Sequence, residues 1–108
     1  MGPKSFSEMQ ERVDKGKFSE VGVALLVSPF SDVREALFYL PYALAAEGSP
    51  ESGAAAEEHW VRFRERMILF DQLAEDAARY QAEDEDVQTA LSALRTEYMA
   101  YIDALPSS

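Results

Sequence analysis

The segment from residue 50 to residue 80 constrains this chain most, because its apolar residues repeat at spacings of three and four along its length. The repeat is carried by Trp60, Phe63, Met67, Phe70, Ala74 and Ala77. Positions expected to face solvent hold Arg62, Glu65, Arg66 and Glu75. This alternation is typical of the seam along which antiparallel helices pack. The sequence therefore predicts a long helix over 50–80 with partner helices against one side.

Four further segments show helical periodicity and are predicted to be helices. They cover residues 5–15, 17–28, 31–46 and 84–105. Ser5 or Ser7 is expected to cap the first of them, and Ser31 the third, because their hydroxyls can accept from free helix amides. Gly16 is expected to end the first, since glycine tolerates a left-handed conformation. Pro29 is expected to end the second, because the residue before a proline avoids helical angles.

Apolar stripes assign one face of each later segment to the core. In 31–46 the stripe is Val33, Leu37, Leu40 and Leu44, and in 84–105 it is Val87, Leu91, Leu94, Tyr98 and Leu105. Pro41 lies inside the former stripe and is expected to kink the helix. With no alternating strand pattern, the predicted fold class is all-α. We expect an up-and-down four-helix bundle, one helix broken by proline, in a single domain over 1–108.

The charge of the chain limits its partners. It carries 20 acidic and 10 basic residues, a formal charge of −10, and no cysteine. Such a chain repels nucleic acid and anionic membranes, so neither is an expected partner. No apolar run approaches the 18 or so residues of a membrane span, which predicts at most a peripheral membrane association. The acidic charge has two readings: a solvated surface, or a complement to a partner with a basic face.

The sequence offers no constellation for catalysis, and we predict neither an enzyme nor a bound cofactor. The only histidine is His59. Metal-binding bundles use Glu-x-x-His, but Ala56 stands three residues before His59. The acidic run 83–86 lacks the ligand spacing and central glycine of an EF-hand. We expect it to begin a helix, where the dipole favours carboxylates.

Arg62, Arg64 and Arg66 form a cluster of basic residues in this acidic chain. One reading is structural: Arg62 pairs within its helix with Glu58 or Glu65. The other is that the three arginines form a docking patch for a partner protein.

Two stretches resemble the PsbQ-like proteins, the small extrinsic subunits of photosystem II. The first is residues 9–21, MQERVDKGKFSEV, with residues 32–37, DVREAL; the second is residues 70–78, FDQLAEDAA. In that family a short helix ends in a small basic turn followed by an aromatic residue. The third helix carries an Asp-x-Leu-x-x-Ala-Ala segment, which residues 71–78 match with one extra residue. The likeness extends from about Met9 to Leu105. The acidic charge differs from the basic plant members and favours an algal or otherwise divergent relative.

The resemblance implies a four-helix bundle in the thylakoid lumen of the chloroplast, with its targeting segment absent from this chain. Its implied role is to stabilise the oxygen-evolving complex without catalysis of its own. Its partners would be membrane-intrinsic photosystem subunits and other extrinsic proteins. The expected contacts include the basic turn, Lys15 and Lys17, together with the three arginines.

Other functions remain open from the sequence. A PsbQ-like paralogue would serve photosystem I or the chloroplast NDH complex instead. A bacterial adaptor, chaperone or anti-regulator would mask a basic or apolar surface of its partner. A metal-binding bundle enzyme is a third class, against which the missing Glu-x-x-His argues.

Overall fold

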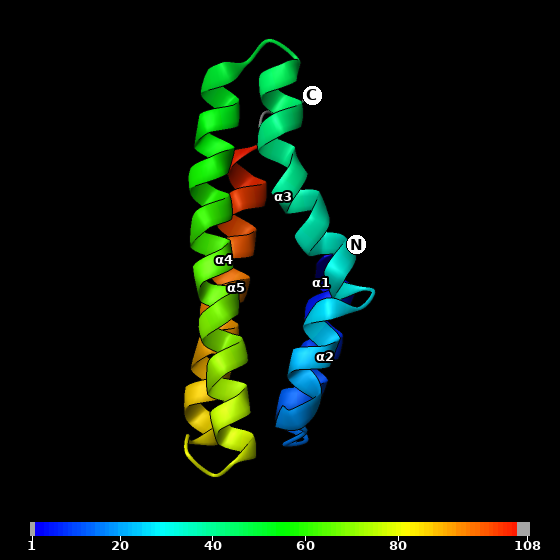
Figure 1. Ribbon diagram of the computed structural model, residues 1–108, viewed down its shortest axis with the longest axis vertical. Helices are drawn as coiled ribbons and strands as arrows, with labels where there is room; N and C mark the ends of the chain where they lie inside the picture. The colour runs from blue at the N-terminus through cyan, green and yellow to red at the C-terminus, as the bar shows by residue number, and fades with distance from the viewer. Residues whose placement is uncertain (1, 106–108) are drawn as a thin grey trace.

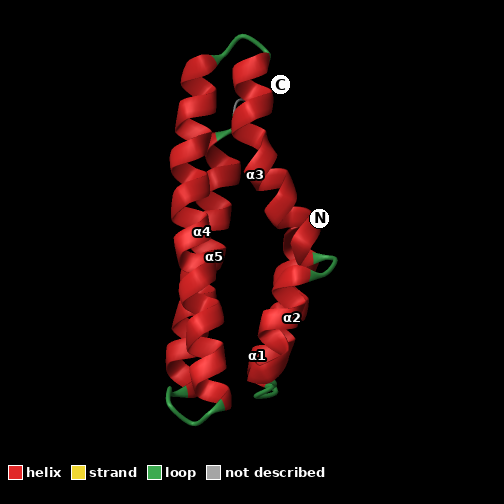
Figure 2. Cartoon of the chain, in the orientation of Figure 1, coloured by secondary structure: helices red, strands yellow, loops and turns green. Residues whose placement is uncertain are grey.

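The computed structural model describes residues 2–105, and these form helices and short connections with no strand (Figure 2). A 3-10 helix, η1 (Phe18–Glu20), follows the first α-helix. The α-helices are α1 (Gly2–Asp14), α2 (Val21–Leu26), α3 (Phe30–Ala46), α4 (Pro50–Ala78) and α5 (Asp84–Ala104). The predicted all-helical class is therefore confirmed. The segment expected over 17–28 is η1 followed by the short α2, and a cis Ser28–Pro29 bond precedes α3.

The long helix α4 sets the shape of the molecule. Its 29 residues span about 44 Å at 1.5 Å per residue, close to the 49 Å length of the molecule. Figure 1 shows α4 and α5 side by side along this length, with α3 and α2 following one another beside α4. The helix α1 packs against α2, α3 and α5. The radius of gyration, 14.7 Å, exceeds the roughly 13 Å of a compact domain of this length.

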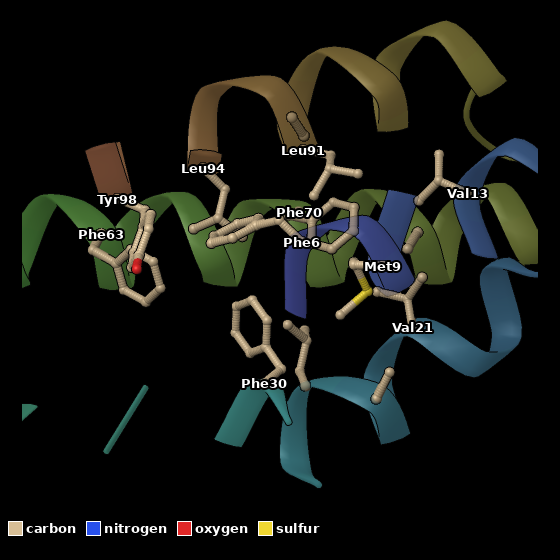
Figure 3. Packing of buried hydrophobic residues seen from close by; sticks show 14 of the residues in the cluster. Phe6, Met9, Val13, Val21, Phe30, Phe63, Phe70, Leu91, Leu94 and Tyr98 are labelled. Atoms are coloured by element: carbon tan, nitrogen blue, oxygen red, sulfur yellow. The ribbon is translucent and has the colours of Figure 1, made fainter. Parts of the chain in front are cut away.

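Aromatic side chains from four helices meet in the core (Figure 3). Phe6 of α1 packs edge-on against Phe30 of α3 at 5.6 Å between ring centroids, and Phe30 lies 6.3 Å from Phe63 of α4. Tyr98 of α5 lies 5.1 Å from Phe6. Phe70 is also fully buried. Each such ring contributes about 1.5–3 kcal/mol on burial, so this cluster joins the helices that are far apart in sequence.

Most residues of the predicted apolar stripes are buried, and the others are half-buried. In α5, Val87, Leu91 and Leu94 are buried together with Tyr98, as predicted, whereas Leu105 is half-buried. In α3, Val33 and Leu37 are buried, but the stripe fades toward its end, where Leu40 and Leu44 are half-buried. Trp60 and Met67 of α4 are also half-buried. Leu44 borders a hollow lined by residues of α4 and α5.

Pro41 lies inside α3, and the helix continues through it to Ala46. A proline has no N–H, so the carbonyl of Leu37, four residues earlier, loses its helical donor. The hydroxyl of Tyr101, on α5, donates to that Leu37 oxygen at 2.8 Å. Tyr101 therefore supplies the hydrogen bond that Pro41 removes. The helix is therefore not interrupted at Pro41, and the interruption between α2 and α3 lies at residues 27–29, before Phe30.

Two predicted caps are wrong. The helix α1 begins at Gly2, so Ser5 and Ser7 lie within it, and Ser5 is buried. The helix α3 begins at Phe30, which places Ser31 in its first turn. In α3, the buried Phe30 extends the helix one residue beyond the cap that local sequence favours. Ser49, by contrast, precedes α4 directly, with Pro50 as the first helical residue.

Three helices end in the same hydrogen-bonded turn. The amide of Lys17 donates to Arg12 and that of Gly16 to Val13, with φ +70° at Gly16. The turn after α3 repeats this arrangement around Gly48, at φ +87°. After α4 the same turn has Tyr80 at the left-handed position, at φ +61°. The stop predicted at Gly16 is confirmed.

The acidic run 83–86 begins α5, as predicted. The Glu83 side chain accepts from the backbone of Asp86, and the Glu83 amide donates to Asp86 Oδ2 at 3.3 Å. This reciprocal pair is a capping box, which satisfies amides that have no helical partner. The run therefore has a structural explanation.

Candidate docking surface

Lys15 and Lys17, predicted to bind a partner, lie together at the end of α1. Lys15 Nζ donates to Glu11 Oε1 at 2.6 Å, and this hydrogen bond raises the pKa of Lys15 and lowers that of Glu11. A shallow surface hollow is lined by these two lysines and by Glu8, Glu11, Arg12 and Glu20. Three basic side chains thus face three carboxylates, so the basic turn is locally neutral.

The three arginines of α4 do not share one surface. Arg62 pairs with Glu97 of α5 at 3.9 Å, so the predicted pairing within α4 is wrong. It is replaced because α5 packs along that side of α4. Arg64 lines a groove between α3 and α4, about 200° around the helix from Arg62. Arg66 is exposed on the Arg62 side. The partner-binding role of these residues and of Lys15 and Lys17 stays a prediction.

An exposed aromatic surface lies instead on the second half of α3. Phe38, Tyr39 and Tyr42 project from it, the tyrosines 62% and 65% exposed. Phe38 contacts Trp60 of α4 edge-on at 5.5 Å and Tyr42 at 5.9 Å. We call Phe38, Tyr39, Tyr42 and Trp60 the aromatic surface. Single exposed apolar residues are ordinary on proteins, but contiguous groups mark interaction sites.

The aromatic surface borders a groove of about 420 Å³ between α3 and α4. Its floor includes Gly53, where a Cβ atom would lie 2.8 Å from the Pro41 carbonyl oxygen. Glycine is therefore required for α3 and α4 to approach this closely. Of the residues that line the groove, Glu57 and Arg64 are charged.

A second groove, of about 510 Å³, lies between α2 and the end of α4. Exposed Val23 and Leu26 of α2 line one side, and Asp71 and Glu75 of α4 the other. Burial raises the pKa of the Asp71 carboxyl, and the nearby Glu75 charge adds to this. Glu75 is itself paired with Arg79 at 2.6 Å.

His59 of α4 lies against Tyr101 of α5. Its ring stacks on Tyr101 at 5.7 Å beside a hollow of about 210 Å³. Its Nδ1 atom is buried without a hydrogen-bond partner among the described residues. Among those residues, no three His, Asp or Glu side chains gather as a metal site requires. None of the helices formed by residues 2–105 has the length and apolar content needed to cross a bilayer.

The aromatic surface is not among the features predicted from the sequence. The apolar pattern predicts a buried stripe for α3 and gives Phe38, Tyr39 and Tyr42 no role. The available signal was the run 36–46, which has no charged residue in a chain that is 28% charged and places aromatics beside the stripe. A helix whose apolar residues extend around its surface needs a second covering partner.

Comparisons with protein-family models, curated proteins and solved structures gave no match to this chain.

Proposed function

We propose that this protein is a non-catalytic docking subunit that binds an apolar helix of a partner protein through the aromatic surface. The observation that carries the proposal is the uncharged run 36–46, exposed on α3 with Tyr39 and Tyr42 outward. The core of a protein interface is depleted of charge and enriched in aromatic residues. This composition matches the run and differs from the rest of the chain.

Energetics support the same surface. Full burial of a large apolar side chain contributes about 1.5–3 kcal/mol, and Tyr39 and Tyr42 leave more than half of their surface in solvent. Tyrosine and tryptophan also dominate the binding energy of interfaces, because they bury much surface and lose little rotamer freedom. A partner that covered Tyr39 and Tyr42 would gain this free energy without remodelling the fold.

The proposal includes the arrangement of the helices. We take α1, the broken pair α2–α3, α4 and α5 as the four members of an up-and-down bundle. The chain reversals between α3 and α4 and between α4 and α5, with α1 against α5, support this arrangement (Figure 1). The aromatic surface then lies on the outside of the bundle, where docking leaves the core unchanged.

The PsbQ-like resemblance names one assembly on which such a subunit would dock, the lumenal side of photosystem II. Salt-washing thylakoids tests it: the protein should appear in the released lumenal fraction and co-purify with the photosystem before the wash. Its absence from both fractions excludes this assembly. An adaptor or chaperone would use the same surface on a different partner.

The docking proposal is tested with tagged protein expressed in its source cells. Tyr42→Ser should shift the protein from a stoichiometric complex to the free chain on native gels. Tyr80→Ser is the matched control, since it also removes an exposed tyrosine but lies in the turn after α4.

Both variants should keep the helical circular dichroism of the wild type, because neither tyrosine is in the core. A Tyr42→Ser protein that remains in the complex as fully as Tyr80→Ser contradicts the proposal.

A further inference from the structure

The two grooves lie on one side of α4. Glu57, Val61 and Arg64 line the first, and Asp71 and Glu75 line the second. Their spacings of three, four and seven place them on the same helix face. The stretch from residue 57 to residue 78, which covers both grooves, is about 32 Å long at 1.5 Å per residue.

Ile68 lies on α4 between the residues that line the two grooves. It lies seven residues after Val61 and three before Asp71, on the same face, and is 52% exposed. Figure 1 shows α3 and then α2 succeeding one another beside α4, so each groove has a helical second wall. We call the two grooves together with the exposed Ile68 between them the furrow. Its apolar side chains are Tyr42 and Val61 in one half, Ile68 in the middle, and Val23 and Leu26 in the other half.

Two carboxylates of the furrow, Glu57 and Asp71, form no ion pair within residues 2–105, and Asp71 is the more buried of the two. Asp71 is partly desolvated beside Leu26, whereas Glu75 is held by Arg79. A positively charged side chain from a partner would form an ion pair with Asp71. The charge of −10 favours approach of a basic partner and opposes a second copy of this chain.

We propose that the furrow along α4 binds one amphipathic α-helix of a partner, its apolar stripe on the aromatic surface and Ile68 and a lysine or arginine against Asp71. This inference rests on the proposed docking function and specifies its occupant. A helix fits better than an extended strand, because both walls are helices whose backbone groups are already bonded and offer no sheet edge. About six turns of partner helix match the length of the furrow.

The test uses two synthetic 21-residue peptides of identical composition, Leu, Ala, Gln and three Lys near one end. In one the leucines recur at spacings of three and four, and in the other they are scattered around the helix. Fluorescence of Trp60, the only tryptophan, reports binding directly, because it lines the furrow. The wild type should bind the amphipathic peptide at least about tenfold more tightly than the scattered one.

Matched variants separate specific binding from charge attraction. Asp71→Asn should weaken binding about fivefold, whereas Glu58→Gln, which removes a carboxylate from another face of α4, should change it less than twofold. Ile68→Ser should weaken binding about tenfold, and Met99→Ser, equally 52% exposed but on α5, should leave it unchanged. Circular dichroism should remain helical in all four variants.

Equal binding of the two peptides, or equal effects of Asp71→Asn and Glu58→Gln, overturns the inference. So does a wild-type dimer in sedimentation that Ile68→Ser alone dissociates, because the occupant is then a second copy. The proposed function is judged separately, by the release of the native partner by Tyr42→Ser. If that release occurs and the peptide does not bind, docking stands and the helical occupant is wrong.

Discussion

Tyr80 adopts a backbone conformation that suits glycine. It follows α4 at φ +61° in the same turn that places Gly16 after α1 and Gly48 after α3. A left-handed residue with a Cβ costs roughly 1–2 kcal/mol. The Tyr80 side chain is 97% exposed, so packing within the chain does not offset this cost.

Replacing Tyr80 by glycine should therefore stabilise the protein. The relief of strain outweighs the roughly 0.5–1 kcal/mol by which glycine favours the unfolded chain, so the net gain is about 0.5–1 kcal/mol. Thermal unfolding should show a rise of roughly 2–6 °C. Gln81→Gly, one residue on, should lower stability, since Gln81 has no positive φ. Unchanged or lower stability of Tyr80→Gly is the contrary result.

Tyr101 stabilises the fold through one hydrogen bond, to the Leu37 carbonyl that Pro41 leaves without a donor. Tyr101→Phe leaves this buried carbonyl unpaired and should cost about 1–3 kcal/mol of unfolding free energy. In a Pro41→Ala background residue 41 supplies an amide, so the same substitution should cost much less. Urea unfolding of the four proteins in this double-mutant cycle measures the coupling. Additive effects would show that the two residues act independently.

The same hydroxyl makes stability sensitive to alkali. Burial raises the pKa of Tyr101 from its ordinary 10.0 to about 12. Since the folded pKa is the higher, the stabilisation is complete below pH 10 and is lost as pH rises through 12. The free energy of unfolding should fall across this window in the wild type and fall less in Tyr101→Phe. Parallel profiles would exclude Tyr101 as the responsible group.

At the scale of elements, periodicity predicts most of the helices because burial acts on whole faces. Most of the stripe residues, such as Phe70 of α4 and Leu94 of α5, are buried as expected, whereas Trp60, Met67 and Leu105 are half-buried. The ends of the helices are harder to predict from the sequence. Local capping favours a start at Ser31, but the buried Phe30 is already the first residue of α3. The effect of Pro41 was also beyond sequence reasoning, because its missing hydrogen bond is replaced from a helix sixty residues away.

The contact between α3 and α4 depends on Gly53. A methyl group there would lie 2.8 Å from the Pro41 oxygen and 3.0 Å from the Ala45 Cβ. Gly53→Ala should therefore destabilise the protein by roughly 1–2 kcal/mol. The free-energy cost of pushing two packed helices apart is larger than the roughly 1 kcal/mol that alanine gains in helix propensity. Ala55→Gly, at an exposed position of α4, measures that propensity alone. A stabilised Gly53→Ala protein would show that the helices are not in close contact here.

Across the whole molecule, charge opposes folding. The charge of −10 is confined to a volume about 20 Å thick, and the ion pairs that offset it are exposed. Raising salt from about 10 to 150 mM shortens the screening length from about 30 to 8 Å and should raise the melting temperature by a few degrees. Arg66→Glu should enlarge this rise and Glu58→Lys should reduce it. A melting temperature that falls with salt would show that the ion pairs dominate.

The candidate site was less predictable than the fold. The basic residues predicted to bind a partner lie on three different surfaces of the molecule. Arg64 is in the furrow, whereas Lys15 is neutralised by Glu11. Which exposed side chains are contiguous depends on the packing of α3 against α4, and a single sequence gives no measure of that packing. Asp71 illustrates this, since its surroundings come from α2.

The packing of α1 against α5 affects how fast the molecule unfolds. Gln10 Nε2 donates to Gln88 Oε1 at 2.7 Å, and both amides donate to Asp14 Oδ1, a contact across 78 residues of chain. The pairs α3–α4 and α4–α5 are neighbours in sequence, so they close short loops and should form first during folding. Joining α1 to α5 closes the longest loop and should come last.

Gln88→Ala should therefore accelerate unfolding, roughly fivefold, and leave the folding rate unchanged in stopped-flow measurements. Gln72→Ala, an exposed change on α4, should alter neither rate. A slower folding limb for Gln88→Ala would instead place this contact in the transition state. With late docking of α1, the lifetime of the folded molecule is governed by the detachment of its first helix.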